Sequence, residues 1–414
     1  MPGTLSAEVA AVAEVAARHA ATVDEKARFP QEAVDRLRDC GLVSACAPRA
    51  AGGAGLDVRG LAVIARGLAR ACAATAMIWS MHQGQLASLW RYAGPGGFLH
   101  DLARQATKEQ WLIASATSEA GIGGDLRRSG AALEPVTDSP IGLFRLSKEA
   151  TTVSYGAHAE ALFVTARRAP DAPASDQVLV AVPARQATLE KTGGWQPLGM
   201  RGTSSPGFRI AAQVGGQNVF PVPFADIAAG AMVPVTQVLW AATWAGLAAE
   251  ALDRAVRMAR RRAARSSGAA GGAGAAGGAG AAGGAGAAGG AGAVGATAAH
   301  APSALAEARW RLAGVDAMVD DMAGHAQRLL DGEAQASVGT AVRANSLKVG
   351  ASESCLEIAH LALRACGMAG YSEQGPYSVA RIIRDLSSSV VMIGNDRILE
   401  NTARMMLVER RGDR

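Results

Sequence analysis

Short runs of β type in the middle of the chain separate two regions of helical spacing, and this three-part pattern limits the folds that are possible. In the first hundred residues, Leu61, Ile64 and Leu68 recur on one face of a helix. From residue 111 to residue 223, the apolar runs are short and are separated by turns rich in Pro, Asp and Gly; they include residues 161–165, 177–181 and 208–212. The pattern predicts an α+β fold whose middle part is a small β-barrel or sandwich.

Long apolar stripes at helical spacing return after Pro234. Trp240 and Trp244 begin one stripe, and in a later stripe apolar residues recur every seven positions up to Gly367, a glycine suited to end a helix. Several long helices with apolar stripes predict a helical bundle. The predicted domains are an N-terminal α-helical domain (1–110), a middle β-domain (111–223) and a C-terminal four-helix bundle (224–414).

An Ala/Gly tract lies between Arg265 and His300, and it repeats the six residues Ala-Ala-Gly-Gly-Ala-Gly. The tract has no large side chains to bury, and its glycines oppose helix propagation. It also supplies many of the 50 glycines, so the composition does not indicate a fibrous protein. We predict a disordered insertion at 266–298 within the C-terminal bundle.

The overall composition is that of a globular protein with a large core. The chain has 414 residues, of which 49% are hydrophobic, and a net charge of only +5, which does not indicate a nucleic-acid partner. No apolar run reaches about 18 residues and no signal-peptide pattern precedes Phe29, so we expect no membrane span and a cytoplasmic location. Because the five cysteines lack metal-ligand spacing, we expect free thiols and no metal site.

Residues 114–125, with the sequence Ala-Ser-Ala-Thr-Ser-Glu-Ala-Gly-Ile-Gly-Gly-Asp, are the most informative stretch for function. They follow an apolar run that reads as a strand, and the hydroxyls of Thr117 and Ser118 lie at its end. Glycines in such a loop let backbone N–H groups approach an anionic or planar ligand closely. An ordinary glycine turn after a strand explains the same residues, so the stretch alone does not decide between the two.

Other motifs accompany this stretch in a definite order along the chain. They are Phe29-Pro30 with Gly52–Leu56, then Leu198–Ser205, then Cys366–Tyr371, then Arg384-Asp385. Together they resemble the acyl-CoA dehydrogenase family of flavoproteins over nearly the whole chain, except for the Ala/Gly insertion and the catalytic loop. The resemblance implies a bound FAD, with FMN as the alternative, and a homodimer or homotetramer.

The resemblance also implies which residues face the flavin ring. Thr117 and Ser118 would contact the isoalloxazine edge, with Gly123 in the same loop. Counting back from Arg167 aligns Ser154 with the family's hydroxyl against the flavin and places Thr152 beside it. This alignment can shift by up to two residues. On the substrate side the resemblance implies two further positions, Gly124 and Thr236.

A second group of residues corresponds to the family's contacts with the far end of the cofactor. The family carries an Arg-x-x-Phe segment that reaches the flavin of a neighbouring subunit; here the Phe is absent and Arg261 is among the nearest cations. Arginines at this point either bind the FAD pyrophosphate or simply pair with a helix C-terminus. Gly367 and Gly370 correspond to a cofactor loop, upstream of which Arg364 replaces the family's usual glutamine. A plain helix C-cap also explains Gly367.

The implied reaction is the FAD-linked α,β-oxidation of an acyl thioester, in which a carboxylate removes the α-proton. Ile393 stands in the place of the family's base, and Thr236 stands at its alternative position. Neither side chain can take a proton. Either Asp396 or Glu400 therefore acts as the base in their place, or the protein does not catalyse removal of an α-proton. The implied partners are an acyl-CoA or related substrate and an electron acceptor or flavin reductase.

Two alternatives to this reaction remain open. Ser154–Ala159 loosely resembles a Ser-Gly-x-x-His-Ala stretch of flavin-dependent monooxygenases with the same fold, which makes His158 a catalytic candidate. A lone histidine is more often structural. The other alternative is a flavin-bound homologue that has lost catalysis, since the base and part of the arginine segment are missing.

Overall fold

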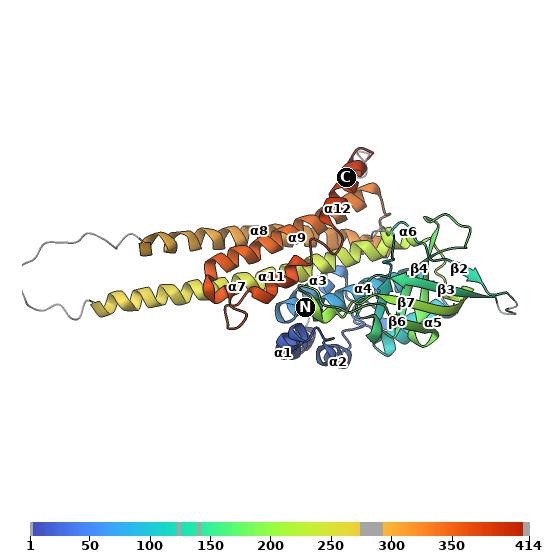
Figure 1. Ribbon diagram of the computed structural model, residues 1–414, viewed down its shortest axis with the longest axis horizontal. Coiled ribbons are helices and arrows are strands. Elements are labelled where there is room, and N and C mark those ends of the chain that lie inside the picture. The colour runs from blue at the N-terminus through green and yellow to red at the C-terminus, as the bar shows by residue number, and fades with distance from the viewer. Residues whose placement is uncertain (1–2, 122–125, 138, 140–141, 274–292, 409–414) are drawn as a thin grey trace, which may run out of the picture.

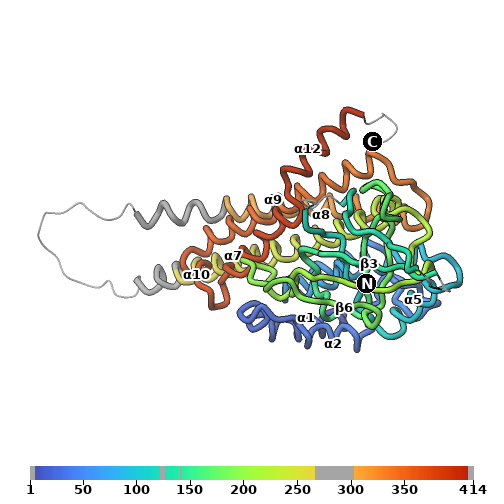
Figure 2. The backbone as a smooth tube through the Cα atoms, turned by 45° about the vertical axis from the view of Figure 1, so that its right-hand side comes forward, coloured from blue at the N-terminus to red at the C-terminus, as the bar shows by residue number. Residues whose placement is uncertain are grey.

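The computed structural model describes residues 3–121, 126–137, 139, 142–273 and 293–408, with only the backbone described at residues 3–4, 266–273 and 293–302. Helices and two small sheets form a body at one end, and long antiparallel helices extend from it (Figure 1). In both backbone views α12 (Asn395–Met406) projects from this body (Figures 1 and 2).

Five helices form the N-terminal region. They are α1 (Gly3–Glu25), α2 (Gln31–Asp39), α3 (Val58–Ala71), α4 (Ala73–Tyr92) and α5 (Gly97–Lys108). The Asp57 side chain caps α3 by accepting a hydrogen bond from the Gly60 N–H. Helix α4 is buried over most of its length, because its Ala-, Met- and Leu-rich sequence packs between the β-region and the long helices. This central position brings α4 to the functional site.

The middle region holds two separate sheets. In one, β1 (Ile113–Ala116) runs parallel to β4 (Ala161–Arg167), which pairs antiparallel with β5 (Gln177–Pro183). The other is antiparallel with the order β2 (Leu133–Pro135), β3 (Leu143–Ala150), β7 (Phe208–Gly215) and β6 (Ala187–Lys191). The middle region was predicted to be a small barrel or sandwich; its described residues form two separate small sheets and no closed barrel, and only isolated bridges extend beyond the strands.

The C-terminal region consists of long helices and short ones. They are α6 (Phe224–Ile227), α7 (Val233–Ala273), α8 (Ala293–Asp331), α9 (Val338–Cys366), α10 (Met368–Tyr371), α11 (Ala380–Ser387) and α12. Helices α7, α8 and α9 pack along one another, and α3 and α4 pack against α7. The shorter helices α11 and α12 pack on α9, so the C-terminal region is helical as predicted and has α3 and α4 packed against it.

Helix α7 is the core element of the molecule. The segment 224–265 is long and apolar enough by composition to cross a membrane, but most of its apolar window is buried inside the protein. A π-helical turn at Ala228–Met232 precedes α7. Such turns are frequent at functional sites.

The Ala/Gly tract differs from the predicted loop at both ends. Helix α7 continues to Ala273 and α8 begins at Ala293, so the first and last parts of the predicted insertion at 266–298 are helical. Alanine has the highest helix propensity, which favours continuation of a helix that is already formed. Residues 274–292 of the predicted insertion lie outside the described residues.

Candidate active site

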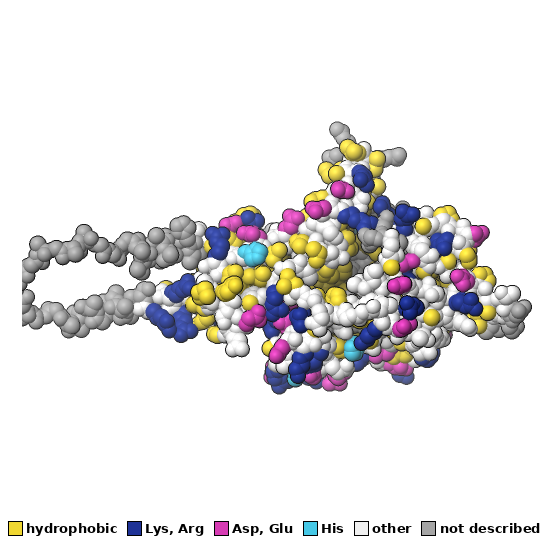
Figure 3. All heavy atoms as spheres, viewed as in Figure 1, with side chains coloured by type: hydrophobic (Ala, Val, Ile, Leu, Met, Phe, Trp, Pro, Cys, Tyr) yellow, Lys and Arg dark blue, Asp and Glu magenta, His cyan; other side chains and the backbone are white. Residues whose placement is uncertain are grey.

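A cavity of about 750 Å³ lies where the β-region, the α4–α7 helix pair and the segment between α11 and α12 meet. In the space-filling view this face is hollowed beside α12, and hydrophobic side chains line the hollow (Figure 3). Leu198 and Val391 line the cavity and yet are 65% and 72% exposed, so they lie at its opening. Three walls can be distinguished.

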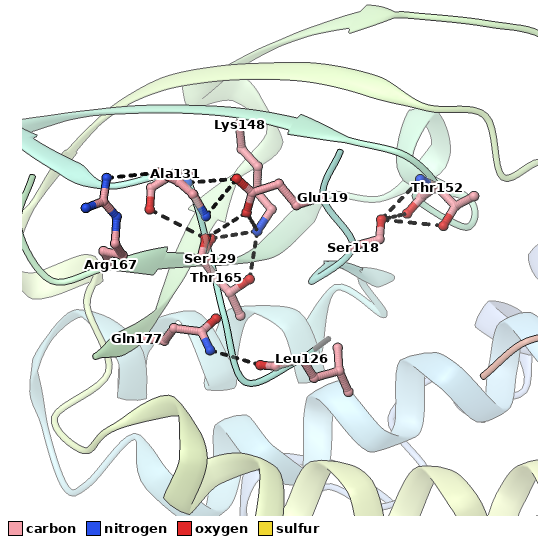
Figure 4. A network of polar contacts seen from close by, with 11 residues as sticks. Ser118, Glu119, Leu126, Ser129, Ala131, Lys148, Thr152, Thr165, Arg167 and Gln177 are labelled. Atoms are coloured by element: carbon pink, nitrogen blue, oxygen red, sulfur yellow. Dashed lines mark hydrogen bonds and ion pairs between the residues drawn. The ribbon is translucent and has the colours of Figure 1, made fainter. Parts of the chain in front are cut away.

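The first wall carries hydroxyl groups from the ends of two strands. Ser118, just after β1, donates a hydrogen bond from Oγ to the Thr152 carbonyl at 2.7 Å, and the Thr152 N–H donates back to that Oγ at 3.1 Å (Figure 4). Thr117 and Ser154 line the same wall. The structure therefore brings together four of the residues that the sequence suggested for the flavin.

A chain of hydroxyls continues behind Ser154. The Ser205 Oγ donates to the Ser154 Oγ at 2.9 Å, and the Thr203 Oγ1 lies 2.9 Å from the Ser205 Oγ. Nearby, Tyr155 and Met200 have φ values of +45° and +52°, in the left-handed region that non-glycine residues rarely adopt. Such strain concentrates at functional sites, and the residue types gave no sign of it.

A buried ion pair holds the segment that follows Ser118. Lys148, which is 0% exposed, places its Nζ 3.2 Å from the Glu119 Oε2 and also donates to the Thr165 carbonyl (Figure 4). The Glu119 Oε1 accepts the N–H groups of Gly130 and Ala131 at 2.9 and 2.8 Å. Burial lowers the pKa of Lys148; burial alone would raise the pKa of Glu119, but Lys148 and the hydrogen bonds outweigh it and lower that pKa. Sequence reasoning missed this pair.

Gly123 and Gly124, the two predicted ligand-facing glycines, lie outside the described residues. Hydrogen bonds connect the residues before and after these glycines to the β-region. The Glu119 carboxylate accepts hydrogen bonds from residues 129–131, and the Gln177 Nε2 donates to the Leu126 carbonyl at 2.9 Å.

The second wall is formed by α4 and α7, and it contains polar atoms without partners. Four lining residues carry a buried polar atom that has no hydrogen-bond partner among the described residues: Gln85 Oε1, Thr236 Oγ1, Gln237 Oε1 and Trp240 Nε1. Thr236 was predicted on the substrate side, and it lies here. A Cβ at Gly84 would overlap the Thr236 hydroxyl, so glycine is required for the close contact of the two helices. Buried polar groups are normally satisfied, so these four atoms are exceptions in the packing of α4 against α7.

The third wall is the segment 391–393 before α12. The Lys348 ammonium, buried on α9, donates to the Ile393 carbonyl and to the Asn395 Oδ1, each at 2.5 Å. Burial lowers the pKa of Lys348 to about 8. Ile393 lines the cavity, and its backbone carbonyl is held by this ammonium.

The motif loop 198–205 is locked onto α11. The Asp385 Oδ1 accepts the Met200 N–H at 2.7 Å, and burial raises the pKa of Asp385 to about 6. A Cβ at Gly199 would overlap the Arg384 carbonyl oxygen. Arg384 in turn pairs with Asp24 of α1 at 2.6 Å. Two of the motifs that carried the resemblance are thus in direct contact.

The proposed acid–base residues do not lie at the cavity. Asp396 is exposed in the first turn of α12, and Glu400 is exposed further along the helix. His158 is also exposed, and its ring stacks on Phe29 with centroids 4.0 Å apart. Among the described residues, no Asp, Glu, Lys, Arg or His side chain lines the cavity.

The residues predicted for the far end of the cofactor gather near the C-terminal end of α9, outside the cavity lining. The Arg261 guanidinium lies over the Tyr377 ring, 5.8 Å from its centroid, and Arg364 is exposed. Gly367 has a φ of +62° and follows the last residue of α9, as a C-cap does. A Cβ at Gly370 would lie 2.5 Å from the Cys366 Cβ, so close packing explains this glycine.

Arginines near residue 261 were expected either to bind the FAD pyrophosphate or to pair with a helix C-terminus, and the neighbouring Arg262 does the second. Arg262 donates to the carbonyls of Ala365 and Cys366 at 2.8 and 2.9 Å, at the C-terminus of α9. This is the favourable pairing of a cation with the negative end of a helix.

Comparison with known proteins identifies relatives for both helical regions. The family model for the acyl-CoA dehydrogenase N-terminal domain matches residues 5–119, and the model for the C-terminal domain matches residues 296–407. The chain is 27% identical over 195 residues to the mitochondrial short-chain specific acyl-CoA dehydrogenase of Sus scrofa. That match spans 45% of this chain and 44% of the relative, so it covers less than half of the relative's length.

Solved structures share the fold over nearly the full length. Butyryl-CoA dehydrogenase from Megasphaera elsdenii superimposes with a TM-score of 0.77 and 18% identity, covering 98% of this chain and 99% of that one. The dibenzothiophene monooxygenase TdsC from Paenibacillus sp. A11-2 superimposes with a TM-score of 0.69 and 19% identity, covering 98% of each chain. At such identities the likeness establishes the fold alone. Because the two family models together match more than half of the 414 residues, the chain belongs to the acyl-CoA dehydrogenase family.

Proposed function

We propose that the chain is a flavin-dependent oxidoreductase whose flavin lies against the hydroxyl wall of the cavity. The observation that carries this proposal is the convergence of Thr117, Ser118, Thr152 and Ser154 on one wall of a cavity that α4 and α7 also line. Hydroxyl groups both donate and accept, so they suit the edge of an isoalloxazine ring, where donors and acceptors alternate. A bound flavin supplies hydride and electron transfer.

The chain's own residues would orient the substrate and exclude water. The hydroxyl chain through Ser205 and Thr203 fixes the position of Ser154. The Lys348 contacts hold the backbone at Ile393, so this side chain covers one side of the cavity. A shielded, mostly apolar cavity strengthens the hydrogen bonds that are made inside it.

We infer FAD and a homodimer or homotetramer as the form that binds it. FAD carries two phosphates, and no cationic side chain in the described cavity lining can pair with them. In this proposal the cation therefore comes from outside the lining. Arg261, beside Tyr377, lies outside that lining. By the sequence resemblance, it is the cation that would reach the cofactor of a neighbouring subunit in the oligomer. An electron-transfer protein or flavin reductase would complete the catalytic cycle.

The leading reaction is the α,β-oxidation of an acyl thioester, which family membership supports. This reaction needs a group that takes the α-proton. Ile393 and Thr236, which the resemblance aligns with the two positions of the family's base, both line the cavity and neither can take a proton. Burial raises the pKa of the Tyr155 phenol, which donates to the Ile113 carbonyl at 2.9 Å, so it is not a base either.

The second candidate is a flavin-dependent monooxygenase that acts on a small molecule. The specific observation in its favour is the absence of acidic and basic side chains from the described lining, because oxygenation does not require a carboxylate there. The shared fold with the dibenzothiophene monooxygenase TdsC is compatible with this chemistry. His158 contributes nothing to it from its place on Phe29 outside the cavity.

Anaerobic mixing of the oxidised, flavin-loaded protein with a panel of acyl-CoA thioesters separates the candidates. Bleaching of the flavin absorbance supports thioester oxidation. No bleaching, but substrate-dependent oxygen consumption with NAD(P)H and a flavin reductase, supports the monooxygenase. Silence in both assays supports the third alternative, a homologue that binds flavin without catalysis.

A further inference from the structure

We infer that Tyr155 and His82 are positioning residues for the flavin, because they hold Ile113 at the start of β1 and so align the two strand ends that form the hydroxyl wall. This inference rests on the proposed function, since that wall is the proposed flavin contact. Neither side chain has to touch the flavin for this role.

Ile113 begins β1 at the edge of its sheet. In the strand order β1-β4-β5, one row of β1 backbone groups faces no neighbouring strand among the described residues. Two side chains take the place of a strand at this point. The Ile113 N–H donates to the His82 Nδ1 at 3.0 Å, and the Ile113 carbonyl accepts the Tyr155 hydroxyl at 2.9 Å. Both polar backbone groups of Ile113 are therefore held from outside the sheet.

The His82 ring has only one arrangement that satisfies its partners. A backbone N–H can only donate, so the Nδ1 that receives the Ile113 N–H carries no proton. The proton is then on Nε2, which lies 2.9 Å from the Val43 carbonyl. Burial lowers the pKa of His82 to about 4, so the ring is neutral at neutral pH and keeps this tautomer. His82 is therefore a fixed acceptor for the Ile113 N–H.

Tyr155 connects Ile113 to the other half of the wall. It directly follows Ser154, and its N–H donates to the Thr203 and Ser204 carbonyls at 2.9 and 3.0 Å. Its φ of +45° is unfavourable for a residue with a Cβ and persists only where the surroundings enforce it. The backbone of Tyr155 is thus fixed beside Ser154 while its buried phenol reaches β1.

The two halves of the wall are joined at two points. At one point the Ser118 hydroxyl and the Thr152 backbone exchange hydrogen bonds, and at the other the Tyr155 phenol binds Ile113. Strand β1 pairs with β4 over its whole length and leads directly to Thr117 and Ser118, so a shift at its start displaces these hydroxyls.

Two attachments fix both the distance and the orientation of the halves, whereas one would leave them free to turn. Groups that bind a cofactor have to be held within about 0.5 Å of their productive positions. The contacts of Ile113 supply the second attachment.

Titration of the full chain with FAD tests this role through Tyr155→Phe, which removes one hydroxyl and keeps the ring. We expect FAD to bind about tenfold more weakly, because the wall loses one of its two attachments. The reduction potential of the bound flavin should also fall, because hydrogen bonds donated to the ring stabilise its more electron-rich reduced form. Loss of a hydrogen bond that served only stability would lower the melting temperature and leave this potential unchanged.

Tyr92→Phe is the matched control. The Tyr92 hydroxyl also donates to a backbone carbonyl, that of Asp226 at 3.0 Å, but Tyr92 lies outside the cavity lining. The FAD affinity and the flavin potential of this variant should equal those of the original chain.

Two substitutions of His82 separate positioning from packing. His82→Asn places an oxygen near the position of Nδ1 and keeps an acceptor for the Ile113 N–H, whereas His82→Gln places its amide near Nε2 and removes that acceptor. FAD should therefore bind to His82→Asn within about twofold of the original affinity and to His82→Gln about tenfold more weakly. If His82 only fills space, the order reverses, because glutamine leaves the smaller cavity.

The flavin content of the original chain distinguishes this inference from the proposed function. A flavin-loaded original chain with unchanged affinity and potential in Tyr155→Phe, or with weaker binding by His82→Asn than by His82→Gln, would overturn the inference and leave the function standing. An original chain that takes up neither FAD nor FMN would overturn both. If thermal melting shows that Tyr155→Phe does not fold, the two His82 variants decide.

Discussion

The Asp385 carboxylate accepts a hydrogen bond from the Met200 N–H at 2.7 Å, although the two residues are 185 positions apart in the chain. Met200 lines the cavity with a φ of +52°, and Asp385 belongs to α11. This bond joins the loop between β6 and β7 to the C-terminal helices, and so it fixes two walls of the cavity relative to each other.

Substitution Asp385→Asn should stabilise the protein at high pH. Burial raises the pKa of Asp385 from 3.8 to about 6, so the folded state binds this proton more tightly than the unfolded state. The stability that protonation contributes is complete below about pH 4 and is lost as the pH rises through about 6. Asparagine can still accept the Met200 N–H, so the variant should gain up to about 3 kcal/mol relative to the original chain between pH 4 and pH 8.

Urea denaturation at a series of pH values measures this difference. Asp171→Asn, at an exposed position, serves as the control and should show no such trend. A stability difference for Asp385→Asn that stays flat with pH would contradict the assignment of a buried carboxylate.

Substitution Gly199→Ala should destabilise the loop that carries Met200. The added Cβ would overlap the Arg384 carbonyl oxygen, which is backbone and cannot move aside without shifting α11. We expect a loss of about 1–3 kcal/mol, as in other overpacked sites, and weaker flavin binding. Gly193→Ala is the matched control, because its Cβ meets nothing within 4 Å. Equal melting temperatures for the two variants would refute the close contact.

Substitution Glu119→Gln should be strongly destabilising. It leaves the Lys148 ammonium, which is 0% exposed, without its carboxylate. Removal of one partner of a buried pair typically costs about 3–5 kcal/mol. Glu149→Gln, one residue from Lys148 but exposed, should have little effect in the same thermal or chemical denaturation. A comparable small effect for both variants would show that the Lys148–Glu119 pair is not buried as described.

Substitution Lys348→Met should loosen the segment 390–395. The Ile393 carbonyl loses this donor, and the Asn395 Oδ1 keeps only the longer hydrogen bond from the Ser352 Oγ, at 3.4 Å. We expect peptides that cover this segment to exchange amide hydrogens about tenfold faster or more, which mass spectrometry can follow. The same peptides should be unaffected by Lys108→Met, at an exposed position on α5. Unchanged exchange in Lys348→Met would show that other contacts hold the third wall.

The resemblance to a known family predicted the hydroxyl wall, and the ends of two strands explain how its residues meet. Thr117 and Ser118 come after β1, and Thr152 and Ser154 come after β3, so the ends of these strands bring them together. The resemblance to a known family also placed Ile393 at the cavity. These predictions rest on local order along the chain and on motif spacing, which a sequence shows directly.

Other features depend on tertiary contacts that a single sequence does not reveal. Gln85 and Gln237 look like ordinary polar positions on helices, and their lack of partners follows only from the packing of α4 against α7. The β-runs were identified, but their pairing into two sheets rather than a barrel is not a local property. Asp396 was a reasonable candidate base by its position, yet an acidic residue in the first turn of a helix also complements the helix dipole, and there it faces solvent.

Titration of the purified chain with FAD, followed by flavin fluorescence, tests the central claim most directly. The account predicts either flavin that copurifies with the protein or saturable uptake at micromolar protein with a fall in fluorescence. Ser154→Phe, which projects a large side chain from the hydroxyl wall, should abolish uptake, whereas Ser175→Phe, at an exposed position, should not. Failure of the original chain to bind FAD or FMN, or equal uptake by Ser154→Phe, would contradict a flavin site in this cavity.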